Sequence, residues 1–323
     1  MTNGKTLIQT DNLKKYFKVR TGVFGDKKTL KAVDSVCIEI YKGETFGVVG
    51  ESGCGKSTLA RTITKLYQPT DGKIIFDGKD ITDLKGKEFR EYQKKMQIIF
   101  QDPYSSLNPS MNVREILSEP LQIHSSIKGS ELENKIIDTL ETVGLSRDVI
   151  DKFPHEFSGG QRQRLGIGRA ISVNPDFILC DEPISALDVS IQAQIINKLE
   201  ELQENLNIAY LFIAHDLSMV KHISHRIGVM YLGKMVEIAT SADLYKEPLH
   251  PYSKALLESI PKIGGQVDFS NVITGDLPDP INLPAGCRFK TRCKYKMKVC
   301  DEIEPTLSYV TKDHCVACHL YKN

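Results

Sequence analysis

The sequence predicts an α/β fold built on a parallel sheet of the kind that binds nucleotides. Strand-like and helix-like patterns alternate along the first hundred residues. A glycine-rich segment with a lysine, residues 50–57, follows an apolar run and precedes a helical pattern. A second apolar run, residues 177–180, ends in two carboxylates. Because open α/β sheets bind ligands at the carboxyl ends of their strands, both segments fall where a nucleotide site is expected.

The individual elements follow from hydrophobic periodicity and from polar, glycine or proline boundaries. The strand-like runs are short and apolar, as buried strands of an α/β sheet are; they cover residues 30–40, 44–49, 97–100, 177–180, 209–214, 227–231 and 235–238. Helical spacing of apolar residues covers residues 56–66, 113–123, 131–143 and 251–259.

Two stretches depart from this alternation. Residues 112–174 show no strand pattern, so we interpret them as a helical subdomain inserted into the α/β core. Residues 261–286 are rich in proline and glycine and are interpreted as a linker to a cysteine-rich tail.

Length and composition exclude several classes of protein. A chain of 323 residues has room for two or three domains and is too long for a small disulfide-stapled scaffold. Because 42 Lys and Arg face 41 Asp and Glu, there is no overall basic footprint for nucleic acid. Residues 1–15 lack the apolar core of a signal peptide, and no apolar run is long enough to span a bilayer. We therefore expect a cytoplasmic chain that reaches a membrane only through a partner.

Residues 50–57 read Gly-Glu-Ser-Gly-Cys-Gly-Lys-Ser and satisfy the phosphate-loop pattern in its required strand-turn-helix context. The glycines let consecutive backbone N–H groups and the helix N-terminus surround a phosphate, and Lys56 adds a positive charge. The Ser57 hydroxyl is of the type that ligates Mg²⁺. The alternative is a glycine turn that contains a lysine by chance.

The run that ends in Asp181 and Glu182 has the form of a Walker B segment. Asp181 is expected to hold the Mg²⁺ shell, and Glu182 to act as a general base on the attacking water. Taken alone, the segment is equally compatible with an acidic turn after a strand.

A third element separates the classes of phosphate-loop protein. Residues 157–164, Phe-Ser-Gly-Gly-Gln-Arg-Gln-Arg, resemble the signature motif of ATP-binding cassette (ABC) proteins and stand just before the Walker B segment. Ser158 and the two glycines after it would form a second anion site at a helix N-terminus, although a flexible turn would read similarly. The match covers roughly residues 5–250, with Phe157 in place of the usual leucine and Cys180 where an aliphatic residue is common.

The resemblance to ABC proteins implies a RecA-like core with a small antiparallel β part and a helical subdomain. It implies a Q-loop glutamine at Gln101, a D-loop at 185–188, a switch histidine at His215, and an aromatic residue that stacks on adenine at Phe17, with Tyr16 as a neighbouring candidate. The implied catalytic residues are Glu182, His215 and Gln101, and the implied Mg²⁺ ligands are Ser57, Gln101 and Asp181. The implied ATP contacts are Phe17, Gly50, Ser52, Gly53, Cys54, Gly55, Lys56, Ser57, Thr58, Gln101, Ser158, Gly159, Gly160, Gln161, Asp181 and Asp188.

Three further segments narrow the resemblance to the ATP-binding subunits of oligopeptide and dipeptide ABC importers, of the OppF and DppF type. They are residues 101–109, residues 250–257 and the terminal cysteines. The resemblance then covers the whole chain and implies an ATPase domain over 1–255, with its helical subdomain at about 102–174, and a C-terminal extension over 256–323.

In that family two related ATPase subunits, usually a heterodimer, meet head to tail beneath two transmembrane permease subunits. An extracytoplasmic peptide-binding protein supplies the substrate. The resemblance therefore implies a peripheral ATPase at the cytoplasmic face of the cell membrane, with ATP held between Lys56 of one subunit and the signature segment of the other.

Two other classes of protein share some of these features. A soluble ABC ATPase in a regulatory or repair role, with an iron-sulfur or zinc tail, would carry the same motifs, but the chain has no coiled-coil insertion, second cassette or net basic charge. A redox-sensing regulator would explain the tail but not a full set of ATPase residues.

Five of the eight cysteines fall within residues 287–323, where a uniform spread would place about one. In a reducing cytosol such clustering favours a metal over disulfides. Cys287, Cys293, Cys300 and Cys318 resemble the iron-sulfur binding extension of some dipeptide-importer ATPases, which implies a [4Fe-4S] cluster, and Cys315 is an extra thiol. Zinc is the chief rival, although zinc sites tend to use closer cysteine pairs. Unligated thiols are the third interpretation.

Cys54 has two interpretations. Its position beside Lys56 and a helix N-terminus favours a reactive thiolate. It is equally compatible with a small, shielded side chain that fills the loop.

Overall fold

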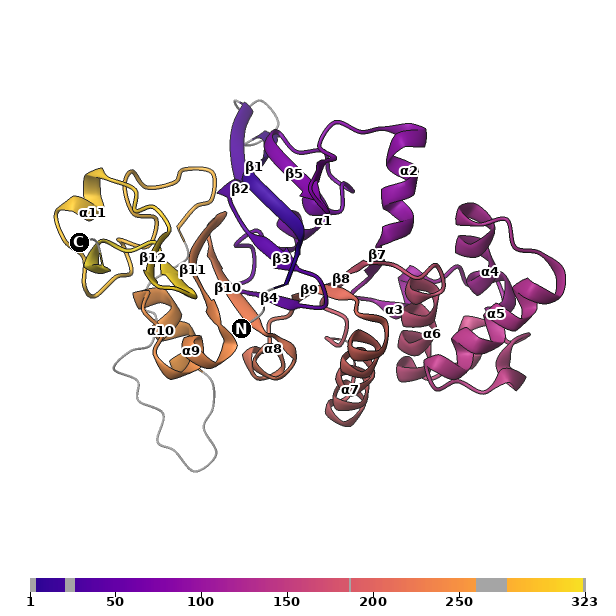
Figure 1. The fold of residues 1–323 in the computed structure, drawn as a ribbon. Coiled ribbons are helices and arrows are strands. Elements are labelled where there is room, and N and C mark those ends of the chain that lie inside the picture. Colours follow the sequence, from indigo (N-terminus) through magenta and orange to yellow (C-terminus); the bar gives the residue numbers. More distant parts are fainter. Residues whose placement is uncertain (1–3, 21–26, 186, 260–277, 322–323) are drawn as a thin grey trace. The chain divides into compact units, whose positions relative to one another are not determined.

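The structure is a computed structural model that describes residues 4–20, 27–185, 187–259 and 278–321 (Figure 1). Its chain divides into two compact units. Unit 1 comprises Met1–Leu7, Ile40–Glu44 and Asp83–Ala214. Unit 2 comprises Ile8–Glu39, Thr45–Thr82 and His215–Asn323.

Unit 2 contains a mixed sheet in the order β12-β13-β11-β10-β4. Its strands are β4 (Thr45–Val49), β10 (Arg226–Tyr231), β11 (Lys234–Thr240), β12 (Ser308–Thr311) and β13 (His314–Val316). β4 and β10 are parallel, and the pairs from β10 through β11 and β13 to β12 are antiparallel. Every residue of β4 is buried, which confirms the apolar run predicted before the phosphate loop.

A second, antiparallel sheet of unit 2 has the order β2-β1-β5-β6. Its strands are β1 (Thr6–Arg20, whose first two residues belong to unit 1), β2 (Lys27–Val36), β5 (Asp71–Phe76) and β6 (Lys79–Asp80). The strand predicted over 30–40 is divided into β2 and the short β3 (Glu39–Tyr41), after Ser35 adopts a left-handed φ of 55°.

The helices of unit 2 connect these strands. They are α1 (Lys56–Ile63), α8 (Leu217–Ile223), α9 (Ser241–Lys246), α10 (Pro251–Glu258), α11 (Val299–Glu302) and the short 3-10 helix η4 (His319–Tyr321). α1 ends three residues earlier than predicted, where Lys65 takes a positive φ. Most of the predicted linker, residues 261–277, lies outside the described residues.

Unit 1 contains three parallel strands in the order β9-β8-β7, and these confirm three of the short apolar runs. The strands are β7 (Met96–Ile99), β8 (Phe177–Asp181) and β9 (Ala209–Ile213), and all residues of β8 and β9 are buried. The helices beside them are α2 (Gly86–Lys95), α3 (Pro103–Ser106) and α7 (Val189–Leu206).

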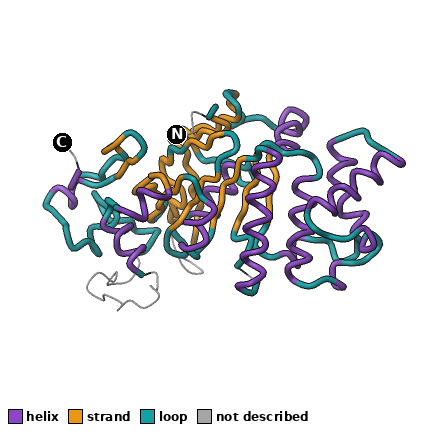
Figure 2. Tube along the Cα trace, turned by 60° about the horizontal axis from the view of Figure 1, so that its bottom comes forward, coloured by secondary structure: helices purple, strands orange, loops and turns teal. Residues whose placement is uncertain are grey.

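Residues 112–174 are all described and form no strand, as predicted. They form α4 (Val113–His124), α5 (Gly129–Thr142) and α6 (Gly159–Ile171), with the 3-10 turns η1 (Arg147–Val149) and η2 (Pro154–Glu156). The three α-helices pack on one another, and this part of the chain is helix and loop only in Figure 2. Asn112 and Glu115 form a capping box that fixes the start of α4.

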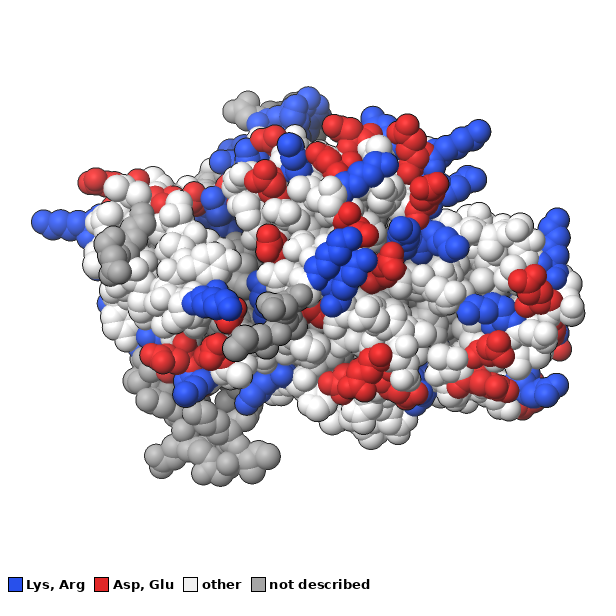
Figure 3. All heavy atoms as spheres, viewed as in Figure 1, with Lys and Arg blue, Asp and Glu red and all other residues white. Residues whose placement is uncertain are grey.

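The surface carries both signs of charge. Lys, Arg, Asp and Glu side chains are interspersed over the face seen in Figure 3, as expected from a formal net charge of +1. Within the described residues, no helix is both long and apolar enough to cross a bilayer.

A buried carboxylate joins β11, α10 and the C-terminal strand β13 in unit 2. Glu237 is 0% exposed, and its two oxygens accept the Leu249 N–H at 2.7 Å and the His250 N–H at 2.8 Å. The His314 ring nitrogen lies 2.7 Å from one of the same oxygens. Burial alone would raise the pKa of Glu237, but these hydrogen bonds outweigh burial and lower it. Glu237 therefore fixes the start of α10 and the tail strand against β11.

We expect Glu237→Gln to destabilise the protein by about 3 kcal/mol at pH 7, because the amide leaves buried donors without their anionic acceptor. The pKa of Glu237 is lowered in the folded state, so its contribution is full above its ordinary pKa of 4.5 and is lost as pH falls through the folded value. Urea unfolding should show a difference in the free energy of unfolding between variant and wild type, and this difference should narrow as the pH falls below 4.5. A difference that stays constant with pH would contradict this role.

Candidate functional site

The phosphate loop lies between β4 and α1 in unit 2. Gly55 is the N-cap of α1 with φ +112°, and a Cβ there would lie 2.1 Å from the Ala32 carbonyl oxygen, so only glycine fits. The first turn of α1 carries no acidic side chain, which leaves the positive end of the helix available to an anion. Ser52 and Gly53 are exposed, and Ser57 and Thr58 are half-buried in the first turn of α1.

The Lys56 ammonium is held inside the loop. It donates to the carbonyl oxygens of Gly50 at 2.7 Å and Glu51 at 3.1 Å, and the residue is only 7% exposed. The structure thus brings the predicted lysine, glycines and helix N-terminus together as a phosphate cradle.

Two residues outside the predicted set contact the loop through Glu51. The Glu51 N–H donates to the Tyr252 hydroxyl at 2.8 Å. The Glu51 carboxylate forms a bidentate ion pair with Arg292, at 2.9 and 3.1 Å. Both residues lie in segments that the sequence analysis singled out, but nothing in the sequence assigned them to the loop. Tyr252 lies in the segment 250–257 that resembles peptide-importer ATPases, and Arg292 directly precedes a cysteine.

The two aromatic candidates for adenine differ in their contacts. The Tyr16 hydroxyl donates to Asp34, and burial together with this bond raises the pKa of Tyr16. Phe17 is half-buried on β1. The Tyr67 ring meets the Phe17 ring edge-on, with 5.7 Å between the ring centroids, and the Lys15 ammonium lies 5.0 Å from the Phe17 ring centroid. Of the two candidate rings, Tyr16 is therefore held by the hydrogen bond of its hydroxyl group, whereas Phe17 has no hydroxyl group to be held in this way.

The predicted switch histidine, His215, is exposed in unit 2 just before α8. The next residue, Asp216, caps α8 by accepting the backbone N–H of Ser218 at 2.8 Å and of Met219 at 3.3 Å. This cap fixes the backbone beside His215.

In unit 1 the structure brings the Q-loop glutamine and the predicted base together. Gln101 Nε2 donates to Glu182 Oε2 at 3.0 Å. Asp181 ends β8 and is 3% exposed, whereas Glu182 takes φ 50° and donates its N–H to the Ile213 carbonyl at 2.9 Å. A non-glycine residue with positive φ is uncommon, and here it turns the chain sharply after the metal-ligand candidate.

The signature segment forms the N-terminus of α6, as predicted. Ser158 and Gln161 make a capping box, with the Gln161 N–H 3.3 Å from the Ser158 hydroxyl and the Ser158 N–H 3.0 Å from Gln161 Oε1. A Cβ on Gly160 would lie 2.7 Å from Ile191 Cγ2, so α6 needs a glycine there to pack against α7. Ser158, Gly159 and Gln161 are exposed, as is Asp188 at the N-cap of α7. Ala186 of the D-loop lies outside the described residues.

The structure favours the shielded interpretation of Cys54 over the reactive one. Cys54 is 1% exposed, and burial raises the pKa of its thiol despite the nearby Lys56. For the Cys54 thiol, burial therefore outweighs the charge of the nearby Lys56.

Four of the tail cysteines lie around one small cavity beside α10. Cys287, Cys293, Cys300 and Cys318 line it together with His250, Pro251 and Phe289. Burial raises the pKa of Cys287 to about 11 and also raises the pKa of Cys293 and Cys318. Among the described residues, however, no group of three or more His, Cys, Asp or Glu side chains is arranged to hold a metal ion.

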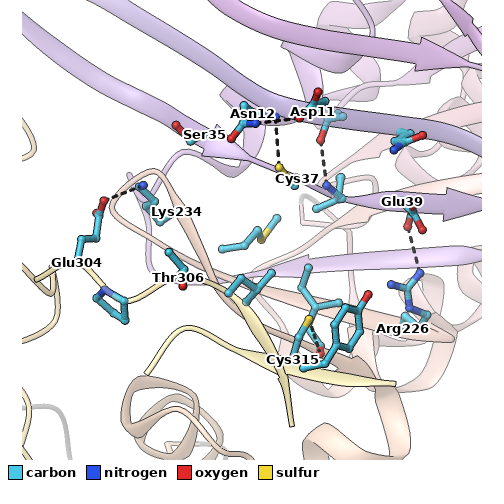
Figure 4. A pocket seen from close by; sticks show the side chains of 18 residues that line it. Asp11, Asn12, Ser35, Cys37, Glu39, Arg226, Lys234, Glu304, Thr306 and Cys315 are labelled. Carbon is cyan, nitrogen blue, oxygen red and sulfur yellow. Dashed lines mark hydrogen bonds and ion pairs between the residues drawn. The ribbon is translucent and has the colours of Figure 1, made fainter. Parts of the chain in front are cut away.

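Cys315 is separate from those four cysteines. It lies on β13, its thiol donates to the Ile238 carbonyl at 3.6 Å, and it lines a different cavity of about 490 Å³ (Figure 4). In that cavity Lys234 pairs with Glu304 at 2.9 Å and Arg226 donates to the Glu39 carbonyl at 3.1 Å. None of the residues predicted to contact ATP lines it.

Comparison with known protein families gives two matches. Residues 33–185 match the family described as ABC transporter, and residues 236–300 match the oligopeptide/dipeptide transporter C-terminal region.

Similar proteins align over nearly the whole chain. The chain is 53% identical over 321 residues to a putative oligopeptide transport ATP-binding protein of Bacillus subtilis, YkfD, covering 98% of this chain and 96% of that protein. It is 46% identical over 321 residues to the oligopeptide transport ATP-binding protein OppF of Salmonella typhimurium, covering 97% and 96%. Among solved structures, the dimeric ATP-binding cassette MJ0796 with bound ADP and Pi is similar, with a TM-score of 0.64, 27% identity, and coverage of 73% of this chain and 99% of that one.

The packing of Cys54 generates a labelling prediction. With substoichiometric N-ethylmaleimide, the exposed Cys37 should react at least about 10-fold faster than Cys54, because a buried, protonated thiol is a poor nucleophile. Peptide mapping by mass spectrometry measures both rates in one sample, and denatured protein serves as the control in which both react. Faster labelling of Cys54 than of Cys37 in the native protein would restore the reactive interpretation.

Proposed function

Because the chain belongs to the family of ABC transporter ATP-binding proteins that serve oligopeptide and dipeptide transport, we propose that it is the ATP-hydrolysing subunit of a membrane importer for dipeptides and oligopeptides. One observation carries the peptide assignment: the chain continues past the ATPase motifs into residues 236–300, which match the oligopeptide/dipeptide transporter C-terminal region. The relatives reported above are named as transport proteins, so a repair or regulatory role is not proposed.

In this proposal the phosphate cradle of residues 50–58 receives the ATP phosphates, and Lys56 exchanges its loop carbonyls for phosphate oxygens. Phe17 stacks on adenine. Ser57, Gln101 and Asp181 would hold Mg²⁺, and the ion would neutralise charge on the phosphates.

The residues of unit 1 supply the base. Glu182 accepts a proton from the attacking water while the oxygen of that water bonds to the γ-phosphorus. The bond between the γ-phosphorus and the ADP oxygen breaks. The contact from Gln101 orients the carboxylate of Glu182. His215 is proposed to contact the γ-phosphate, from an exposed position beside a capped helix.

The exposed signature segment suggests how two subunits meet. We propose that Ser158, Gly159, Gly160, Gln161 and Asp188 face ATP bound to a second, related ATPase subunit in a head-to-tail heterodimer. The exposure of Ser158, Gly159, Gln161 and Asp188 supports this, as does the first turn of α6, which carries no acidic side chain.

The remaining partners follow from the family. Two transmembrane permease subunits hold the ATPase pair at the cytoplasmic face of the membrane, and an extracytoplasmic peptide-binding protein delivers substrate to the permeases. Residues 1–255 are proposed as the ATPase domain, with a helical subdomain at about 102–174, and residues 256–323 as the extension.

Replacing the proposed base tests the hydrolytic role. Glu182→Gln should lower ATP turnover by about 100-fold or more while ATP still binds, because the amide keeps the shape and the Gln101 contact but does not accept a proton. The measurement is phosphate release alongside ATP binding by calorimetry, with the importer reconstituted in vesicles and labelled peptide uptake as the transport readout.

Lys56→Ala is the matched control, since it should remove ATP binding as well as turnover. Near-normal turnover by Glu182→Gln would eliminate Glu182 as the base. Uptake of peptide that continues without ATP hydrolysis would eliminate the transport role.

We further propose that Cys287, Cys293, Cys300 and Cys318 bind a [4Fe-4S] cluster. Their shared cavity and the separate place of Cys315 support this ligand set. The cations between the first two cysteines, Arg288, Lys290 and Arg292, are each paired with a carboxylate. Because the described thiols are not arranged around an ion position, cluster binding requires them to converge. Zinc remains the alternative occupant of a four-cysteine site.

Anaerobic purification separates these occupants. Iron-sulfur binding predicts brown protein with about four iron atoms per chain, whereas zinc predicts colourless protein with about one zinc atom. Cys293→Ser should lose the metal, and the matched control Cys315→Ser should keep it. Protein without iron or zinc would leave the cysteines as unligated thiols and refute both metal sites.

A further inference from the structure

The phosphate loop contains an acidic side chain, Glu51, in the second position of the cradle. A carboxylate beside a site for a polyphosphate opposes binding through like-charge repulsion. The negative charge of Glu51 must therefore be compensated for a polyphosphate to bind, and the contacts of Glu51 show how this happens.

Glu51 is held at all three of its polar groups. Its N–H donates to Tyr252, its carbonyl accepts from Lys56, and its carboxylate pairs with both terminal nitrogens of Arg292. A two-point guanidinium pair fixes the plane of the carboxylate as well as its position. The Arg292 side chain is 8% exposed and that of Glu51 25%, so the pair is largely removed from solvent.

Arg292 is itself placed by the cysteine-rich segment. The backbone N–H of Arg292 donates to the Phe289 carbonyl at 3.0 Å. The Phe289 ring packs on Tyr231 and Tyr252, with ring centroids 5.3 and 5.5 Å apart. Arg288 anchors the same segment through ion pairs with Asp34 and Glu304. The guanidinium therefore reaches the loop from a segment that has further anchors of its own, at Phe289 and Arg288.

We propose that Arg292 is a positioning residue for ATP binding: it cancels the charge of Glu51 and fixes its carboxylate, so that the cysteine-rich C-terminal segment sets the electrostatics of the phosphate loop. This inference rests on the proposed function, because it assumes that residues 50–58 bind ATP phosphates. It adds a requirement that the tail be folded for ATP to bind tightly.

Charge cancellation and simple structural bracing predict different results in a double variant. Removing the cation with Arg292→Met exposes the phosphate site to an uncompensated carboxylate, so ATP affinity should fall about tenfold. Removing the carboxylate as well, with Glu51→Gln and Arg292→Met together, should return the affinity to within about threefold of wild type. If Arg292 only braces the loop, the double variant has lost the same brace and stays weak.

The experiment is calorimetric titration of the full-length protein with ATP and Mg²⁺, at low ionic strength, for wild type and each variant. Arg292→Lys keeps the charge without the two-point geometry and should lie between wild type and Arg292→Met. Lys312→Met is the matched control, because it removes a cation from an exposed turn of the same segment. Circular dichroism melting of each variant identifies any that fail to fold.

A fold defect in Arg292→Met does not end the test, since Glu51→Gln alone keeps Arg292 in place. It should bind ATP at least as tightly as wild type if the carboxylate is the unfavourable charge. The inference is overturned if Arg292→Met binds as wild type does, if the double variant stays tenfold weak, or if Glu51→Gln alone binds tenfold more weakly.

The proposed function fails in a distinguishable way. Lys56→Ala should abolish ATP binding in the same titration. Wild-type protein that does not bind ATP, or a Lys56→Ala variant that binds normally, would overturn the phosphate site and the inference together. Lys56-dependent binding that is insensitive to Arg292 would overturn the inference alone.

Discussion

The contacts of Glu51 are the constraint on which the nucleotide-binding part of this protein depends. A phosphate loop binds its ligand through backbone N–H groups that a rigid loop holds in position. Here rigidity comes from outside the cradle: Tyr252 of α10 and Arg292 of the tail both hold Glu51. The buried carboxylate of Glu237 in turn fixes the start of α10 and strand β13, so the C-terminal region is built into the support of the loop.

Each compact unit contains some of the residues predicted to act on ATP. In unit 2 the strand β4, the glycine turn and α1 form the cradle, and the Cys54 side chain in this turn is buried. In unit 1 the left-handed turn at Glu182 presents the carboxylate to Gln101. Ser158 and Gln161 cap the N-terminus of α6, and Ser158, Gly159 and Gln161 are exposed there.

Sequence reasoning predicted the features that rest on local pattern. The β4 run, the phosphate loop, the β8 run with its two carboxylates and the helical section were all predictable, because periodicity and glycine spacing are local signals. The strand β1 was missed because it is polar and only partly buried, and its pairing with β2 and β5 sets its conformation. The pair between Glu51 and Arg292 joins residues 241 positions apart, and a single contact across that distance leaves no periodic signal. The burial of Cys54 likewise follows from tertiary packing, which charges near it in sequence do not reveal.

The chain belongs to the ATP-binding proteins of oligopeptide and dipeptide transport, and its proposed place is beneath two permease subunits at the membrane. The most direct test is to co-express it with and without the two permease subunits of a peptide importer and to measure how much of it sediments with washed membranes. The account predicts that the chain is recovered with the membranes only when the permeases are present. Recovery in the supernatant despite folded permeases would contradict the account.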